Sequence, residues 1–319
     1  MLRTLGNTNL RITALGMGCW PIAGISSIDV NEADSLATLR AAFDAGINFF
    51  DTAYNYGFDG QSEKMIAREL GSHRNEIIIA SKGGLHWIEG KQARCGRPET
   101  LFRECDESLQ RLKTDHIDLY YLHVPDPNVP IAESAGAISR LIEQGKVRSA
   151  GLSNANVEQL EEFHRTCPLT AYQPHFNMLQ REIEDSQLPW CVTNGVSVVV
   201  YWPLMKGMLA GHLPRGHVFD PKDGRHKYPM FNGDEWQKNQ DFLDVLRAMS
   251  IEIGRPVSQI VLNWTIQRAG ITAALCGAKR PRQIQENAET MNWSLSDEKI
   301  RRIDQAIAKR GPIVSRAAV

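Results

Sequence analysis

The chain has 319 residues, of which 42% are hydrophobic and 23% are charged, as in globular proteins that bury a substantial core. The chain has 36 lysine and arginine residues and 37 acidic residues, so its net charge does not favour binding to nucleic acid or to an anionic membrane. We therefore expect a small-molecule partner. The 6 cysteines are scattered without a CxxC pair or zinc-type histidine spacing, which predicts reduced thiols and no metal. The length admits two ordinary domains or one α/β barrel of about 250 residues or more.

The first residues of the chain are predicted to form a cap. Residues 2–13 alternate around Gly6, Asn7 and Thr8, which predicts a small N-terminal β-hairpin. Residues 1–13 lack the charged and then apolar layout of a secretory signal, and the longest strongly apolar stretch, 196–205, is too short to cross a bilayer. We therefore expect a cytoplasmic protein.

An alternation of strand-like and helix-like segments occupies the rest of the chain. The runs that read as strands are 14–20, 47–53, 77–82, 117–123, 147–154, 170–177, 196–204 and 271–278. The first is followed by a helix-like segment at 31–45, and the same order then recurs. Eight such units with nearly continuous apolar strands predict an α/β fold, a (β/α)8 TIM barrel made by a single domain, residues 1–319.

Two segments depart from this regularity. The seventh unit carries a long loop, 205–236, rich in glycine, proline and aromatic residues, which we expect to close over the active face. An extra amphipathic helix is predicted at 296–309. A doubly wound nucleotide-binding sheet is the competing architecture, but its GxGxxG fingerprint fails, because Gly16 and Gly18 are followed by Cys19, Trp20 and Pro21.

Ionisable side chains follow three successive strands. In a barrel the carboxyl ends of the strands converge on one cavity, and this rule selects Asp51, Lys82 and His123, with Tyr56 on the loop after Asp51. We expect Lys82 to lower the pKa of the Tyr56 phenol, Asp51 to hold Lys82 charged, and His123 to bind the substrate oxygen or the phenol. The alternatives are a structural ion pair, a core histidine and a tyrosine that packs the loop.

These strand ends carry recognisable segments. FFDTAYNYG, IIIASKGG and IDLYYLH, with GLSN, YQPHFN and CGAKRPRQIQEN further on, resemble the signature segments of the aldo-keto reductase superfamily. The resemblance extends from the opening hairpin to about residue 290 and is greatest to the bacterial and potassium-channel β-subunit-like branch, in which the long loop covers the cofactor. It implies that Tyr56 is the general acid and base, supported by Asp51, Lys82 and His123.

A cofactor site is expected at the later strand ends. Lys279 and Arg280 begin a helix whose dipole prefers anions, and a 2′-phosphate would resolve that conflict, although a solvated basic turn is the alternative. The resemblance favours NADPH, with NADH also open. It implies that Ser153, Asn154 and Gln173 bind the carboxamide of the nicotinamide and that Tyr201 stacks on its ring. It also implies backbone contacts to the pyrophosphate from Leu204, Lys206 and Gly207. The residues that it places at the adenosine end are Gly277, Lys279, Arg280, Gln283 and Asn287. Trp202 stands where serine is common, which leaves the contacts there open.

The sequence thus predicts an oxidoreductase that reduces an aldehyde or ketone to an alcohol, reversibly, with hydride from NADPH and a proton from Tyr56. A cofactor-bound regulatory subunit without catalysis and a Schiff-base aldolase that uses Lys82 are the alternatives. Trp20, Phe58 and Trp87, with Phe231, are candidates for an aromatic substrate pocket or for the core. The oligomeric state stays open.

Overall fold

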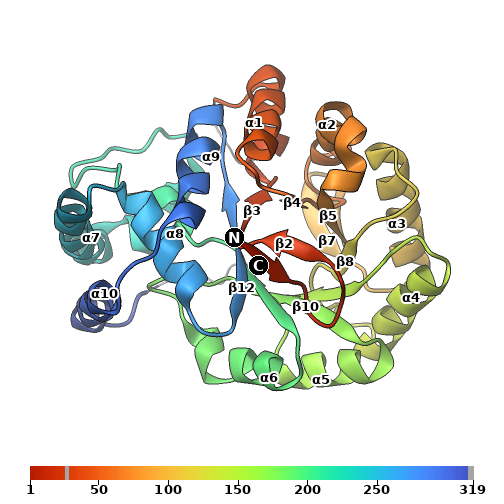
Figure 1. Ribbon diagram of the computed structural model, residues 1–319. Coiled ribbons are helices and arrows are strands. Elements are labelled where there is room, and N and C mark those ends of the chain that lie inside the picture. The colour runs from red at the N-terminus through yellow and green to blue at the C-terminus, as the bar shows by residue number, and fades with distance from the viewer. Residues whose placement is uncertain (26–28, 315–319) are drawn as a thin grey trace.

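The computed structural model describes residues 1–25 and 29–314. Its strands close into a parallel barrel surrounded by helices, which confirms the predicted (β/α)8 TIM barrel (Figure 1). Residues 26–28, in the loop expected before the first helix, and 315–319, at the end of the expected domain, lie outside the described residues.

The barrel strands coincide with the eight predicted apolar runs, except that two of them extend one residue beyond the run, at Gly83 and at Leu169. They are β3 (Leu15–Gly18), β4 (Phe49–Asp51), β5 (Ile78–Gly83), β8 (Leu119–Leu122), β9 (Ala150–Ser153), β10 (Leu169–Gln173), β11 (Ser197–Val200) and β12 (Ile271–Gly277). Each pairs in parallel with its neighbour, and the pairing of Ala274 with Leu15 closes the ring. The strands are apolar throughout because side chains fill the barrel on one side and helices cover them on the other.

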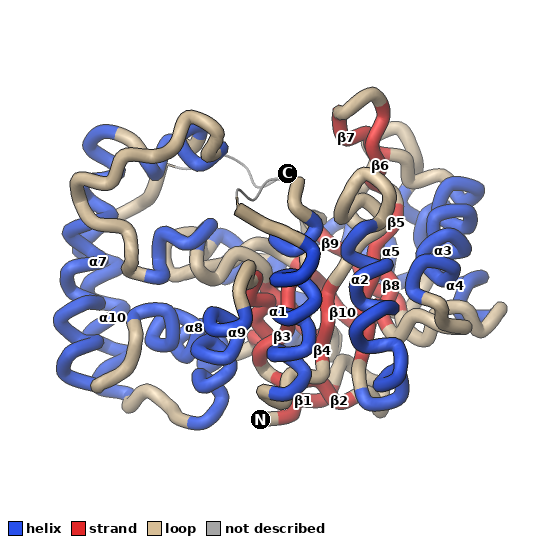
Figure 2. The backbone as a smooth tube through the Cα atoms, turned by 90° about the horizontal axis from the view of Figure 1, so that it is seen from above, coloured by secondary structure: helices blue, strands red, loops and turns tan. Residues whose placement is uncertain are grey.

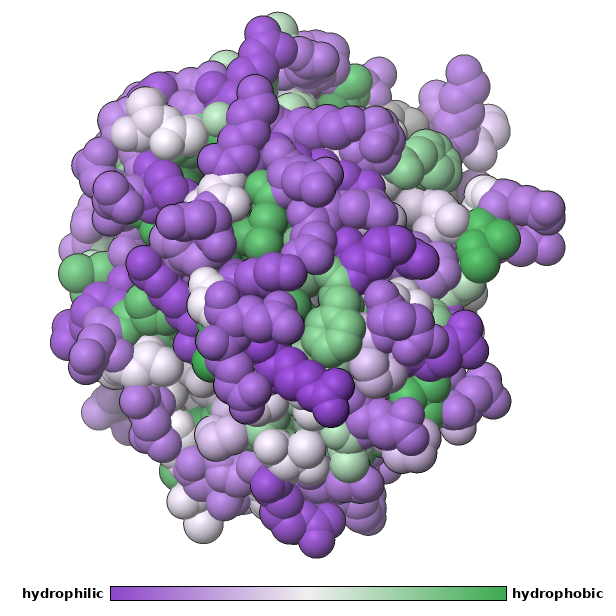
Figure 3. Space-filling model, turned by 90° about the vertical axis from the view of Figure 1, so that its right-hand side faces the viewer, coloured by the Kyte–Doolittle hydropathy of each residue, from purple (hydrophilic) through white to green (hydrophobic). Residues whose placement is uncertain are grey.

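The helices surround the barrel as expected from the alternation. They are α1 (Glu32–Asp44), α2 (Gln61–Leu70), α3 (Pro98–Leu112), α4 (Ile131–Glu143), α5 (Val157–Thr166), α6 (Gln187–Thr193), α7 (Gly233–Ile253), α8 (Val257–Gln267), α9 (Pro281–Ala288) and α10 (Asp297–Arg310). The predicted extra helix is confirmed as α10, which begins after the N-cap Ser296 and packs on α7. Figure 3 shows that the outer face over α2 to α4 is mostly hydrophilic.

The amino end of the barrel is closed by a hairpin. β1 (Leu2–Thr4) and β2 (Arg11–Thr13) pair in antiparallel fashion, as predicted. Leu5 and Ile12 are fully buried and pack with Phe49 in the barrel interior. The cap therefore keeps water out of the end opposite to the predicted site.

The carboxyl end of the barrel carries two structures that the sequence did not predict. The segment after β5, where the sequence predicts no strand, is an antiparallel hairpin, β6 (Leu85–Ile88) and β7 (Lys91–Arg94), turned at Glu89 and Gly90, both at positive φ. The expected long loop is partly ordered into the 3₁₀ helices η4 (Met205–Ala210), η5 (Gly224–Lys227) and η6 (Pro229–Phe231), and α7 already begins at Gly233. The predicted end of that loop at residue 236 is thus wrong.

Figure 2 shows the β6–β7 hairpin and the segment that precedes α7 at the end of the barrel opposite to β1 and β2. The remaining short helices are η1 (Pro21–Ala23), η2 (Gly71–Glu76), η3 (Glu182–Asp185) and η7 (Glu289–Asn292). All six cysteines are free. None of the helices in the described part of the chain is both long and apolar enough to span a membrane.

Candidate active site

The four predicted residues meet at the carboxyl ends of β4, β5 and β8. Lys82 Nζ donates to Asp51 Oδ1 at 2.5 Å, to the Thr52 carbonyl at 2.8 Å and to Tyr56 Oη at 3.2 Å. The rings of Tyr56 and His123 lie 6.0 Å apart. One ammonium group therefore joins the carboxylate of a strand end to the phenol of the following loop, with all three of its donors engaged.

Burial governs the protonation of this group. It lowers the pKa of Lys82 and raises the pKa of Asp51, and in each case the charge of the partner opposes the shift. The pKa of Tyr56 is raised well above its usual value by burial, then by Asp51 and Cys19. The expectation of a lowered pKa for Tyr56 is therefore wrong. It considered the nearby Lys82 ammonium but not the loss of hydration that burial imposes on the phenolate.

His123 is neutral at pH 7. Burial, and then the charge of Lys82, lower its pKa well below the usual value. Its Nδ1 atom is buried and has no hydrogen-bond partner among the described residues. Buried polar atoms are normally paired, so this unpaired nitrogen indicates that His123 completes its hydrogen bonds only when a ligand is bound.

The expected carboxamide-binding residues form one network beside the four. Asn154 Nδ2 donates to the His123 carbonyl at 3.1 Å, and Tyr201 Oη donates to Asn154 Oδ1 at 2.7 Å. Ser153 Oγ donates to the Gln173 carbonyl at 2.7 Å. Gln173 Nε2 in turn donates to Asp51 Oδ2 at 2.7 Å, a link that the sequence did not suggest.

Cations gather where the segment after β11 meets the start of α9. The Lys206 ammonium lies 4.0 Å from the ring centroid of Trp202 and 4.7 Å from that of Tyr228. Arg225, from η5, reaches the Lys206 carbonyl at 3.5 Å and is paired with Asp223. Trp202, Met205 and Lys206 all have positive φ, an uncommon backbone for such residues that marks this turn as a special conformation.

Lys279 lies in the same electrostatic environment. Burial lowers its pKa, and the charge of Arg225 lowers it further, while Asp223 acts in the opposite direction. Arg225 was missed by the sequence reasoning, since the loop that carries it was expected to be unstructured. The basic run Arg225 to Lys227 after Asp223 was the available signal.

The remaining expected cofactor residues line the β12 to α9 connection. Arg280 pairs with Asp34 of α1 at 3.0 Å and donates to the Asp29 carbonyl at 2.6 Å. The Gln283 side chain accepts from the backbone of Lys279 and Arg280 at 2.9 and 3.2 Å. Asn287 Nδ2 lies 3.0 Å from Cys276 Sγ.

Two backbone positions complete this set. A side chain at Gly277 would approach the Pro21 ring to 2.6 Å, so only glycine fits there. The Leu204 carbonyl, at the start of η4, accepts hydrogen bonds from the backbone N–H groups of Gly207 and Leu209.

Aromatic rings border the phenol. The rings of Trp20 and Tyr56 lie 5.1 Å apart, and those of Phe58 and Trp87 lie 5.0 Å apart. Trp87, on β6, donates through Nε1 to the Asn55 carbonyl at 2.9 Å, next to Tyr56. Phe231 instead packs with Phe219 of the same long loop and with Trp236 of α7.

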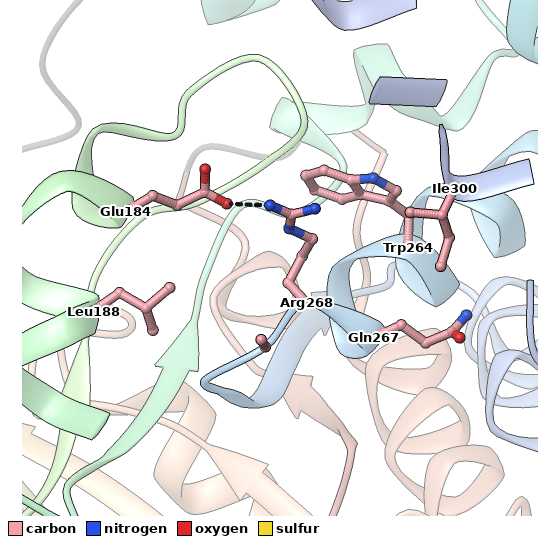
Figure 4. A pocket seen from close by; sticks show the side chains of 7 residues that line it. Glu184, Leu188, Trp264, Gln267, Arg268 and Ile300 are labelled. Atoms are coloured by element: carbon pink, nitrogen blue, oxygen red, sulfur yellow. Dashed lines mark hydrogen bonds and ion pairs between the residues drawn. The ribbon is translucent and has the colours of Figure 1, made fainter. Parts of the chain in front are cut away.

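A separate cavity of about 460 Å³ lies on the outer wall of the barrel, beside the amino end of β12 (Figure 4). Glu184 and Arg268 line this cavity and form an ion pair at 3.1 Å. The Arg268 guanidinium lies 5.0 Å from the ring centroid of the buried Trp264. None of the four residues at the carboxyl end lines this cavity, so it is not the candidate active site.

Comparisons with known proteins identify the family of the chain. The sequence profile of the Aldo/keto reductase family matches residues 14–308. Aldo-keto reductase YhdN of Bacillus subtilis is 33% identical over 298 residues, which cover 92% of this chain and 90% of that protein. The NADH-specific methylglyoxal reductase of Escherichia coli strain K12 is 30% identical over 310 residues, covering 92% and 94%.

A solved structure gives the same result at the level of the fold. Glycerol dehydrogenase from Gluconobacter oxydans superposes with a TM-score of 0.91 at 32% identity, covering 98% of this chain and 96% of that one. The resemblance expected from the strand-end segments is confirmed. The chain belongs to the aldo/keto reductase family, a family of oxidoreductases that use nicotinamide cofactors.

Proposed function

We propose that the chain reduces an aldehyde or ketone to an alcohol, with NADPH as the preferred reductant, and that Tyr56 donates the proton. Family membership supports carbonyl reduction in general. The observation that carries the assignment is the 3.2 Å contact between Lys82 Nζ and Tyr56 Oη within a buried polar cluster. A phenol beside a held ammonium is suited to proton transfer.

The raised pKa of Tyr56 fits the role of an acid, because the phenol keeps its proton at neutral pH until a substrate oxygen takes it. As the phenol gives up the proton, negative charge develops on Oη, and the Lys82 ammonium stabilises that charge. Asp51 and the Thr52 carbonyl fix the ammonium in place. The neutral His123 ring can donate one N–H to the same substrate oxygen.

The residues present fit a nicotinamide dinucleotide. Arg225 lies close enough to Lys279 to lower its pKa and contacts the Lys206 carbonyl, and an anionic phosphate would relieve the repulsion between Arg225 and Lys279. Gly277 is exposed at the end of β12, where its backbone is open to a ligand. A bound reduced nicotinamide would supply the hydride, while this chain would bind and orient the cofactor and the substrate and would donate the proton. A relative that is NADH-specific makes the choice between NADPH and NADH a matter for measurement.

Two other functions compete with this proposal. A Schiff-base aldolase needs a free amine, and the three hydrogen bonds of Lys82 argue against one. A regulatory subunit without catalysis would bind the cofactor but would not turn over. The complete set of Asp51, Tyr56, Lys82 and His123 favours catalysis over this alternative.

The test is a panel of aldehydes and ketones, incubated with the purified protein and either NADPH or NADH, and followed by the loss of absorbance of the reduced cofactor. We expect turnover of at least one carbonyl class, with a lower KM for NADPH than for NADH. Tight NADPH binding with no oxidation in single-turnover experiments would favour the regulatory subunit. Borohydride trapping of a carbonyl on Lys82 would favour the aldolase.

A further inference from the structure

A buried carboxylate lies behind the strand that carries Lys82. Side chains alternate along a strand, so Lys82 points into the barrel and its neighbour Ser81 points outward to the helices. There Ser81 Oγ donates to Glu63 Oε1 of α2 at 2.7 Å. Glu63 is fully buried. A carboxylate in this position requires partners, because an unpaired buried charge is strongly destabilising.

The counterion of Glu63 is Arg111 of α3. Arg111 Nη1 lies 3.3 Å from Glu63 Oε2 and donates to the Tyr54 carbonyl at 3.2 Å. The guanidinium also lies 4.4 Å from the centroid of the Tyr54 ring. A side chain at Gly60 would approach Arg111 Cδ to 2.5 Å, so the loop packs closely on the arginine at that end as well. Arg111 thus contacts the loop that carries Tyr56, residues 52–60, at two places.

These contacts close into a ring. Tyr54 donates through its backbone N–H to the Lys82 carbonyl at 3.0 Å, which brings the chain back to the residue next to Ser81. Glu107 braces the ring from outside, since it accepts from Tyr54 Oη at 2.7 Å and lies 3.4 Å from Arg111 Nη2. The ring therefore passes through both the strand of Lys82 and the loop of Tyr56.

We propose that Arg111 and Glu63 are positioning residues for proton transfer, because their ion pair fixes the Lys82 strand and the Tyr56 loop relative to each other. This inference rests on the proposed function. Neither residue touches the phenol or the ammonium. Their effect is on the separation of Lys82 Nζ and Tyr56 Oη, and a displacement of about 1 Å at such a contact can cost roughly 100-fold in rate.

The test compares Arg111→Ala, Ser81→Ala and Ser81→Thr with the wild-type protein in steady-state reduction of the best carbonyl substrate. Arg111→Ala and Ser81→Ala should lower kcat roughly 10- to 100-fold, with the KM for substrate and the Kd for NADPH nearly unchanged. Ser81→Thr keeps the hydroxyl and should retain most of the activity. Added guanidinium ion should restore part of the kcat of Arg111→Ala.

Arg103→Ala is the matched control. Arg103 lies on the same helix and near the same Glu107, at 3.7 Å, but its side chain is 56% exposed and lies outside the ring. This variant should keep wild-type kcat. Hydrogen exchange gives a readout that does not depend on turnover, and the amides of residues 52–60 should exchange faster in Arg111→Ala and Ser81→Ala than in Arg103→Ala.

Wild-type kcat in a folded Arg111→Ala or Ser81→Ala variant would overturn the inference, as would a loss confined to KM. If Arg111→Ala does not fold, Ser81→Ala decides alone, since it removes one hydroxyl. Tyr56→Phe, measured in parallel, keeps the two claims apart. Full activity of Tyr56→Phe would refute the proposed function, whereas an inactive Tyr56→Phe beside a fully active Ser81→Ala would refute only the positioning role.

Discussion

Two charged clusters of this molecule are built from similar groups and differ in burial. At the carboxyl end of the barrel, Lys82 and Asp51 have side chains that are 0% and 2% exposed. On the outer wall, Arg268 and Glu184 are 25% and 22% exposed, and Arg181 shares the same carboxylate. Both clusters place a cation near an aromatic ring, Tyr56 in the first and Trp264 in the second.

The difference in burial separates a site for chemistry from a structural contact. On the outer wall the ions remain partly solvated, their interaction is screened, and removing one of them leaves a charge that water can reach. In the barrel the desolvation of Lys82 and Asp51 is costly, and the pair is tolerated because hydrogen bonds engage each charge. A cluster that shifts the pKa of its neighbours in this way is a candidate functional site.

The largest expected effect is that of Lys82→Met, which removes the ammonium and leaves Asp51 buried without its ion pair. We expect a loss of about 3–5 kcal/mol in the free energy of unfolding and at least a 100-fold fall in kcat. Denaturant unfolding and steady-state kinetics measure the two. The double variant with Asp51→Asn should regain stability without regaining kcat, and an equal recovery of both would contradict the assigned role of Lys82.

The second effect concerns the cofactor. Lys279→Met should raise the KM for NADPH roughly tenfold, about 1.4 kcal/mol of binding, and leave the KM for NADH unchanged, because only NADPH carries the 2′-phosphate. Kinetics with each cofactor measures both values in one preparation. An equal rise for the two cofactors would place Lys279 elsewhere than at that phosphate.

A third, smaller effect is a dependence of stability on pH. Burial and Lys82 lower the pKa of His123 in the folded protein, whereas the unfolded chain takes up this proton near its ordinary value of 6.5. The unfolded state then binds more protons, so stability is full above about pH 6.5 and declines as the pH falls toward the lowered pKa of the folded state. Thermal melting of wild type and His123→Gln across that interval should show the steeper decline for wild type, and parallel curves would contradict it.

The smallest effect is expected on the outer wall. Arg268→Gln should cost about 1 kcal/mol or less in the free energy of unfolding and should leave kcat at its wild-type value. Denaturant unfolding and the carbonyl reduction rate provide the two readings. A large loss of stability, comparable with that of Lys82→Met, would remove the distinction between the two clusters.

The sequence predicts the barrel well because its strands are short apolar runs between amphipathic helices, and the carboxyl ends of such strands must converge. This rule is enough to bring Asp51, Lys82 and His123 together. The β6–β7 hairpin escapes the same reasoning, since β7 is polar and exposed and its turn, Glu89 and Gly90, lacks the usual asparagine or aspartate before glycine.

The electrostatics of the site could not be predicted in the same way. The sequence places Lys82 near Tyr56, but the net pKa shift of the phenol depends on how far solvent is excluded, which spacing does not reveal. The ring through Arg111 joins residues 48 and 57 positions apart in the chain, so no local pattern indicates it. Strand ends are specified locally, whereas the contacts that orient their side chains arise from helix packing.

Proton donation by Tyr56 is isolated by Tyr56→Phe, which removes one hydroxyl and keeps the ring beside Trp20. We expect kcat for carbonyl reduction to fall roughly 100- to 10,000-fold, while the Kd for NADPH, measured by fluorescence titration, stays within about twofold of the wild-type value. Wild-type kcat in Tyr56→Phe, with the cofactor bound as before, would contradict the account.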